Sequence, residues 1–466
     1  MLRTFFLLIF TCLFGSLSGQ TVTIYGQAPD YAGKELIFYT FPEPISHQPK
    51  ILAETKIGLD GTFNLGFKTN QSIEIYCDLE KLRGTLVAEP GATYQISLPT
   101  YAPRTSQEAA SPYFQPELYW LGIKGANPPD LNFLVRAFLT DYNRELATHT
   151  IDLYQKKSAD SVKAIISRLE KNYPAGKDPY LNALKTYSYG ELELIIFQPA
   201  KEQIIQKYFA GKNVMLSHPA YQHLFKAIYS DYLTGKSQDF HQKEFIAPAL
   251  KGDFAGFVHQ LTSAGYNLPA AELLACKCFY DGFHDGKFDK NAMTKGLKEA
   301  TIQVTFEPLK EVLPGIVRKI TFLQEGNPAP GLVLINRQNV KLPLRANGKF
   351  LYLAFFKSAS KECRAELDSL VGMEKKLNTI LTVIPISLDE NFGDATKFWN
   401  EKKYPWELYA AAEPEKVRKD YLLKTVPTFY LISPDQKLVL SQALSPSHNF
   451  EALFLKIYRE SRFRKQ

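Results

Sequence analysis

Four residues near the end of an apolar run carry the side chains best suited to chemistry in this chain: Ser360, Lys361, Glu362 and Cys363. A thiolate at a helix N-terminus is stabilised by the helix dipole and by free backbone amides, and it can attack a disulfide. A serine hydroxyl becomes a nucleophile only beside a partnered base. His448 is the only histidine in the C-terminal third of the sequence, so no base stands near Ser360 in sequence.

Ser360 has instead the residue type of a helix N-cap, with Glu362 in the first turn, where negative charge is favourable. We expect Lys361 and Glu362 to form a solvated face of the turn. Cys363 has two interpretations that the sequence leaves open. It is either a buried structural residue or a residual monothiol that reacts alone, receives an electrophilic sulfur or forms a mixed disulfide with a partner.

No other pattern of a catalytic or metal site occurs. The eight histidines are dispersed, without H-E-x-x-H or paired Cys/His spacing, and neither a Walker A sequence nor a dinucleotide-binding glycine pattern is present. The run 281–289 is polar and glycine-rich but lacks the ligand order of an EF-hand. We therefore expect no cofactor and no metal.

The elements around Ser360 alternate between strand and helix over residues 326–460, which is the order of a thioredoxin-like α/β domain. Expected strands cover 350–356, 381–388, 428–432 and 437–440, and expected helices cover 362–373, a segment from 395 to 399 and 450–459.

The segment GNPAPGLVLINRQNVKLPLRANGKFLYLAFFKSASKECRAEL resembles the TlpA/ResA-like branch of the thioredoxin superfamily, the exported bacterial redoxins. In that family the turn reads Trp-Cys-x-x-Cys, followed by Arg or Lys, any residue and Glu. Here Ala359 stands for the Trp, Ser360 for the first Cys and Cys363 for the second, so the CxxC motif is degenerate. Glu366 matches a carboxylate that tunes the cysteines in the family, and residues 425–428 (TVPT) match its cis-proline signature.

The resemblance implies a mechanism that this chain cannot complete. The first Cys attacks a substrate disulfide and the second resolves the mixed disulfide. With Ser360 in the first position, we expect a non-catalytic binding or structural module, with Val426 and Pro427 facing another protein or an extended peptide. Residual thiol–disulfide oxidoreductase or monothiol activity through Cys363 stays the alternative.

The N-terminal residues 20–100 are expected to form a β-sandwich, because six or seven short alternating strands are punctuated by turns. Asp60-Gly61 between two such runs predicts a hairpin. The order resembles the sandwich ahead of thioredoxin-like domains in exported bacterial proteins. A ligand- or glycan-binding role for it rests on that analogy alone.

Residues 101–320 are expected to be mostly α-helical, from apolar stripes at helical spacing, and to act as a spacer or packing domain. Cys276 and Cys278 would lie on different faces of one helix and therefore cannot bridge each other. Together with Cys77, they are expected to be small buried hydrophobic residues.

The first 19 residues have the pattern of a signal peptide: Arg3, an apolar run over 4–17, and small residues at Ser18 and Gly19. This predicts export to the periplasm or cell envelope of a Gram-negative bacterium. Lipidation at Cys12 is disfavoured, because it would need a small residue before the cysteine and Thr11 stands there after bulky Phe10. No later apolar stretch is long enough to cross a membrane. The net charge of +7 is scattered, which argues against nucleic-acid binding, and the basic run Arg459, Arg462, Arg464 and Lys465 is expected to be a solvated terminus.

Overall fold

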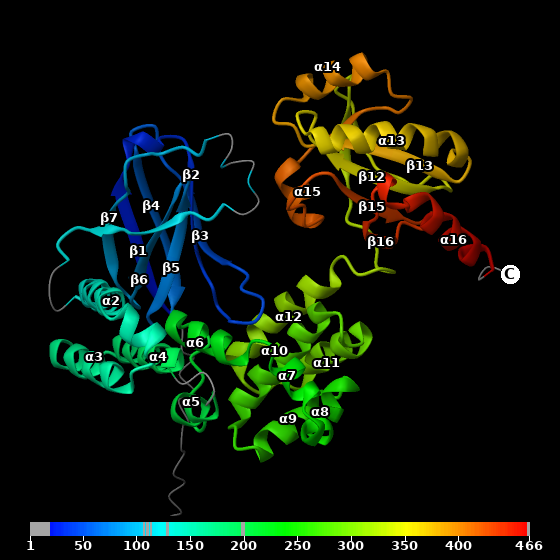
Figure 1. The fold of residues 1–466 in the computed structure, drawn as a ribbon. Helices are drawn as coiled ribbons and strands as arrows, with labels where there is room; N and C mark the ends of the chain where they lie inside the picture. The colour runs from blue at the N-terminus through cyan, green and yellow to red at the C-terminus, as the bar shows by residue number, and fades with distance from the viewer. Residues whose placement is uncertain are drawn as a thin grey trace, which may run out of the picture. The chain divides into compact units, whose positions relative to one another are not determined.

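A computed structural model describes residues 19–105, 108, 111, 114–126, 130–196 and 201–463 (Figure 1). The described chain belongs to two compact units, one ending at Ile316 and the other beginning at Val317. The predicted signal peptide, apart from Gly19, lies outside the described residues, as do Arg464 and Lys465. The limits 20–100, 101–320 and 326–460 stay predictions.

Two sheets face each other in the first unit. Their orders are β4-β1-β7-β9 and β3-β2-β5-β6-β8. One hydrophobic core lies between them and draws Val22 and Ile24 from the first sheet, and Phe38 and Ile75 from the second. The strands are β1 Gln20–Gln27, β2 Glu35–Thr40, β3 Lys50–Lys56, β4 Thr62–Thr69, β5 Ile73–Leu79, β6 Leu82–Ala88, β7 Thr93–Ser97, β8 Glu117–Trp120 and β9 Gly122–Ile123.

The hairpin prediction at Asp60-Gly61 is wrong, although the turn itself forms. Gly61 has a φ of +81°, and the Asp60 carboxylate accepts hydrogen bonds from Thr62. The flanking strands, however, join different sheets, since β3 pairs with β2 and β4 pairs with β1. A turn signal fixes the local reversal of the chain but not the partner of each strand.

The helical prediction for residues after 100 also fails at its start. Strands β8 and β9 extend the two sheets, β8 by pairing with β6 and β9 by pairing with β7. Regular helices are described from residue 131 onward: α2 Leu131–Thr148, α3 Ala159–Asn172, α4 Pro179–Ile196, α5 Lys201–Tyr208, α6 Pro219–Tyr229, α7 Tyr232–Gln238, α8 Lys243–Leu250, α9 Phe254–Ser263, α10 Leu268–Asp285, α11 Lys290–Gln303 and α12 Glu307–Thr321.

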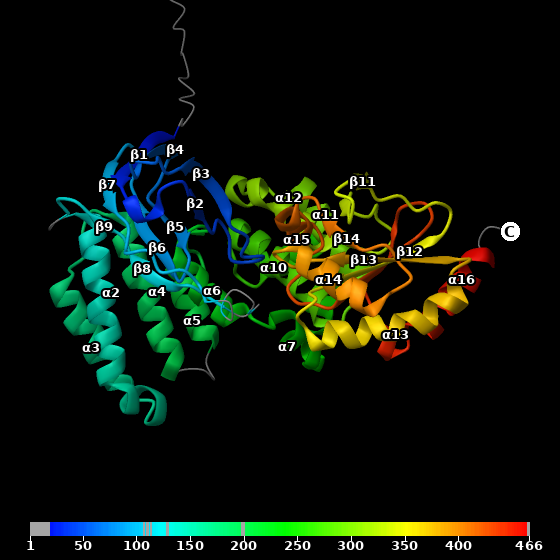
Figure 2. The same ribbon diagram turned by 90° about the horizontal axis from the view of Figure 1, so that it is seen from above.

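The first helices lie beside the sheets, and α2 is joined to β6 by polar contacts. Figures 1 and 2 both show α2 and α4 beside the strands of the first unit. Buried Asn132 of α2 pairs with the backbone of Val87 in β6, accepting from its N–H at 2.7 Å and donating to its C=O at 2.8 Å. This bidentate contact satisfies a buried amide, which would otherwise be costly.

The second unit is a seven-stranded sheet of order β11-β10-β14-β13-β12-β15-β16. The strands β12 and β13 are parallel and are joined through helix α13, whereas β15 and β16 follow in antiparallel order before helix α16. The elements are β10 Val333–Asn336, β11 Lys341–Pro343, β12 Phe350–Phe356, α13 Lys361–Leu377, β13 Leu381–Ser387, α14 Phe392–Lys402, β14 Tyr409–Ala411, α15 Pro414–Asp420, β15 Thr428–Ile432, β16 Leu438–Ala443 and α16 Phe450–Phe463. This topology is that of a thioredoxin-like fold.

Strand β12 is buried on both faces and divides the core of this unit in two. Tyr352 and Phe356 pack with residues of α13, α14 and α16 on one face. Leu353 and Phe355 pack with residues of α15 on the other face. A continuously apolar strand is expected where helices cover both sides of a parallel pair. The sheet thus holds the start of α13 at the carboxyl end of β12.

Candidate functional site

The Ser360 hydroxyl is engaged in local hydrogen bonds. Ser360 is the N-cap of α13, and its Oγ accepts from the backbone N–H of Cys363 at 3.2 Å, which confirms the cap prediction. The same hydroxyl donates to Glu362 Oε2 at 2.8 Å. Hydrogen bonds from its own backbone and from Ser360 lower the pKa of Glu362. Lys361 and Glu362 are exposed, as expected. The arrangement orders a helix end, and the lowered pKa of Glu362 makes its carboxylate a weak base toward the Ser360 hydroxyl.

The turn before Ser360 is tied to the sheet by contacts that the sequence reasoning missed. The backbone N–H of Ser358 donates to Asp389 Oδ2 at 3.0 Å, and its hydroxyl donates to Oδ1 at 3.1 Å. Ser387, at the end of β13, also donates to this carboxylate. Arg364 Nε donates to the Ser358 carbonyl at 2.6 Å. Asp389 stands just after the predicted strand 381–388, and that position was its only sequence signal.

Cys363 is fully buried, with none of its surface exposed, in the core formed by β12, α13, α14 and α16. Burial raises the pKa of its thiol, and hydrogen bonding from Ser360 and from the Lys357 backbone only partly opposes that rise. A thiol with a raised pKa stays protonated near neutral pH and is a poor nucleophile. Cys77, Cys276 and Cys278 are also buried, and all four described cysteines are free thiols.

The peptide bond between Val426 and Pro427 is cis, as the resemblance implies. Val426 is half-buried and packs against the core clusters on both faces of the sheet. Thr428 pairs with Phe355, so the loop before β15 lies at the carboxyl end of β12. The pairing of β15 with β12 begins at Thr428. Within the described residues, neither the N–H nor the C=O of Val426 has a backbone hydrogen-bond partner.

Glu366 is held by a turn far along the chain, in the 3₁₀ segment η5, Pro446–His448. Its Oε2 accepts from the Ser447 N–H at 3.0 Å, and its Oε1 accepts from the Ser447 hydroxyl. Ser447 Oγ also lies 3.0 Å from His448 Nδ1, and Ser445 Oγ lies 2.7 Å from the same nitrogen. The structure therefore brings His448 near Glu366, although the two residues are far apart in the sequence. The carboxylate hydrogen-bonds to Ser447 and not to Cys363, so it fastens α13 to η5.

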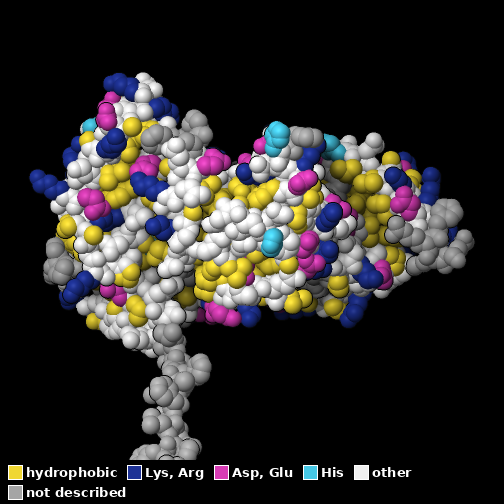
Figure 3. Space-filling view, turned by 90° about the horizontal axis from the view of Figure 1, so that it is seen from below, with side chains coloured by type: hydrophobic (Ala, Val, Ile, Leu, Met, Phe, Trp, Pro, Cys, Tyr) yellow, Lys and Arg dark blue, Asp and Glu magenta, His cyan; other side chains and the backbone are white. Residues whose placement is uncertain are grey.

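Figure 3 shows Lys and Arg side chains interspersed with Asp and Glu over one face. Over the described ranges, no group of three or more His, Cys, Asp or Glu side chains is arranged to hold a metal ion. None of the described helices combines the length and apolar composition that crossing a membrane requires.

Comparisons with known proteins gave structural similarities only. No protein-family model and no curated protein matches the chain. Among solved structures, the chain is similar to a putative thiol-disulfide oxidoreductase from Bacteroides vulgatus, with 19% identity over 29% of this chain and 97% of that chain and a TM-score of 0.28. A putative thiol:disulfide interchange protein DsbE from Chlorobium tepidum has 28% identity over 29% and 97% of the two chains, with a TM-score of 0.26. An uncharacterized thioredoxin-like protein from Porphyromonas gingivalis has 19% identity over 28% and 90%, with a TM-score of 0.25.

Proposed function

We propose that this chain is an exported protein whose thioredoxin-like unit is a non-catalytic binding module for another protein. The observation that carries the proposal is the chemistry at the start of α13. Ser360 occupies the position of an attacking thiol and caps the helix, while Cys363, the only thiol of this turn, is completely buried. Dithiol–disulfide exchange needs an accessible thiolate and a resolving thiol, and this turn offers neither.

An extended polypeptide is the partner that the accessible groups favour. Within the described residues, the main-chain N–H and C=O of Val426 have no hydrogen-bond partner, and Lys361 and Glu362 of the same unit are exposed. An added strand gains affinity from such main-chain groups, and neighbouring side chains select its sequence. The contacts among Ser358, Asp389 and Arg364 keep the turn in one conformation, which limits the ordering cost of binding.

Two assays separate this proposal from residual redox activity through Cys363. In the presence of dithiothreitol, the purified full-length protein is not expected to reduce insulin disulfides faster than dithiothreitol alone. A thiol-reactive probe at pH 7 is expected to label Cys363 only after the protein is denatured. Insulin reduction at thioredoxin-like rates, or rapid labelling of native Cys363, would favour the oxidoreductase or monothiol alternative and contradict the proposal.

Hydrogen exchange tests binding at Val426. The probe is reduced, carboxymethylated α-lactalbumin, which is extended and has no free thiol. Binding should slow amide exchange in a peptic fragment covering 423–429, because Val426 gains a partner there. The edge strand β11, Lys341–Pro343, serves as the control and should exchange at its unbound rate. Binding that protects β11 but leaves 423–429 unchanged would place the partner at the β11 edge of the sheet and refute this part of the proposal.

Export is proposed from the N-terminal sequence alone. The apolar run over 4–17, followed by Ser18 and Gly19, supports cleavage after one of these two residues. Expression in a Gram-negative host followed by N-terminal sequencing of the periplasmic fraction checks it. A product that keeps Met1 and stays in the cytoplasm would exclude export.

A further inference from the structure

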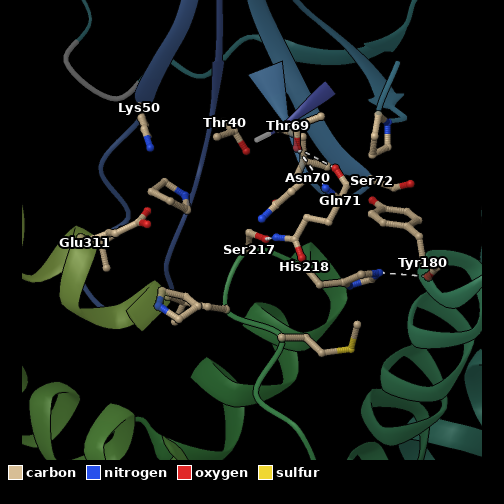
Figure 4. A pocket seen from close by; sticks show the side chains of 18 of the residues that line it. Thr40, Lys50, Thr69, Asn70, Gln71, Ser72, Tyr180, Ser217, His218 and Glu311 are labelled. Atoms are coloured by element: carbon tan, nitrogen blue, oxygen red, sulfur yellow. Dashed lines mark hydrogen bonds between the residues drawn. The ribbon is translucent and has the colours of Figure 1, made fainter. Parts of the chain in front are cut away.

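The first unit contains a cavity of about 800 Å³ that is separate from the start of α13 (Figure 4). Its walls come from the ends of strands β2 to β5, from the loop 213–218 and from the beginning of α12. Ligand sites in proteins commonly enclose about 300–1,000 Å³, so the space suits a small molecule or a few residues of peptide.

Charges of both signs line this cavity. Lys50 of β3 and Lys68 of β4 supply ammonium groups, and Glu311 of α12 supplies a carboxylate. Figure 4 shows Lys50 entering from the strand side and Glu311 from the helix side. All three side chains are exposed, and within the described residues none of them has an ion-pair or hydrogen-bond partner. A ligand that carries both a positive and a negative group could pair with the carboxylate and with an ammonium group of this lining at the same time.

Amide and hydroxyl groups from the turn between β4 and β5 and from the loop 213–218 also line the cavity. Gln71 Nε2 donates to Ser217 Oγ at 2.9 Å, which joins these two segments across the wall. The side-chain amide of Asn70 has no partner among the described residues and points toward the open space in Figure 4. An amide offers both a donor and an acceptor, which matches the peptide group of a ligand.

A buried polar chain stiffens another wall of the cavity. The Tyr180 hydroxyl donates to Glu74 Oε2 at 3.3 Å, and His218 Nε2 lies 3.1 Å from the Tyr180 carbonyl. Because that carbonyl can only accept, Nε2 carries the ring proton. Burial lowers the pKa of His218 to about 4, so the ring is neutral at pH 7. The charge of the cavity therefore comes from Lys50, Lys68 and Glu311.

We propose that this cavity binds a zwitterionic ligand of the amino-acid or short-peptide class. The ligand carboxylate pairs with Lys50 or Lys68, its ammonium group pairs with Glu311, and its amide groups meet Asn70. A simple anion would face the carboxylate of Glu311, and a neutral sugar would leave all three charges unpaired, so both fit the lining less well. The proposal is independent of the function proposed for the start of α13.

Calorimetric titration of the full chain at low salt tests this proposal, with trialanine bearing free termini as the probe. N-acetyl-trialanine amide, which lacks both charges, and neutral maltotriose are the comparison ligands. Trialanine should bind saturably, and the capped peptide should bind at least about tenfold more weakly. Maltotriose should give no saturable heat.

Variants locate the bound peptide. Glu311→Gln and the double variant Lys50→Met/Lys68→Met should each weaken trialanine binding at least about fivefold. Lys56→Met and Glu54→Gln are matched controls, because both residues are exposed on β3 but do not line the cavity. Their affinity should stay within about twofold of wild type. Circular dichroism confirms that each variant is folded. Absence of trialanine binding, equal affinity for the capped peptide, binding of maltotriose alone, or unchanged affinity in the lining variants would each overturn the proposal.

Discussion

Replacing Ser360 by cysteine should rebuild a disulfide-forming pair at the start of α13. The Ser360 side chain already contacts both the backbone and the thiol of Cys363, so a sulfur in place of Oγ would lie beside Cys363 Sγ. In the reduced state, loss of the serine cap should cost about 1 kcal/mol of unfolding free energy. In the oxidised state, chain entropy for a closed loop of about four residues predicts a gain of about 2 kcal/mol over the reduced variant.

Guanidinium unfolding, followed by tryptophan fluorescence, measures both changes. Trp399 and Trp406 are buried in the second unit and Trp120 belongs to β8, so a Trp120→Phe background limits the signal to the second unit. Ser360→Ala is the matched control, because it loses the cap without gaining a sulfur. Ser360→Cys/Cys363→Ala should show no change on oxidation. The oxidised Ser360→Cys protein should also lose two alkylatable thiols by mass spectrometry and, once cycled with dithiothreitol, reduce insulin. If the folded Ser360→Cys variant keeps both thiols after treatment with an oxidant, the reasoning is refuted, because the turn would then not hold the two sulfurs at disulfide distance.

Three further predictions concern groups that the structure places in defined contacts. Asp389→Asn should lower the unfolding free energy of the second unit by about 1–2 kcal/mol, because three hydrogen bonds from Ser358 and Ser387 lose their charged acceptor. Guanidinium unfolding in the Trp120→Phe background measures this change, and an unchanged midpoint would contradict the prediction. Glu366→Ala should speed amide exchange in η5 by removing the acceptor of both hydrogen bonds from Ser447, whereas exchange in β13 stays unchanged; equal exchange in wild type and variant would show that this contact does not hold the turn. Burial raises the pKa of Glu191 to about 7, so the folded protein binds an extra proton between the ordinary carboxyl range and pH 7, and this stabilising contribution is lost as pH rises through about 7. Glu191→Gln should therefore raise the thermal midpoint of the first unit at pH 8 and leave it nearly unchanged at pH 4; the same effect at both pH values would rule out this titration.

The sequence determined which elements carry the C-terminal site. The apolar run of β12, the serine cap and the amphipathic start of α13 are local features, so composition and spacing were enough to predict them. The short elements β14 and α15 were missed because a strand of three residues and a helix of seven have too few positions to show a period. The sequence also gives serine at position 360, and the resemblance implies that this serine stands where an attacking thiol would be.

Tertiary structure decided which distant residues meet. Asp389, Arg364 and Ser358 converge on the turn, Glu366 bonds with Ser447, and the Asp60-Gly61 turn sends its two strands into different sheets. Long-range contacts arise from the packing of whole elements, and local sequence carries little information on that packing. The burial of Cys363 was one of two interpretations from sequence, and the structure shows it fully buried in a core cluster built from several strands and helices of the second unit. The cavity near Lys50 and Glu311 gave no sequence signal, because its walls come from segments far apart in the chain.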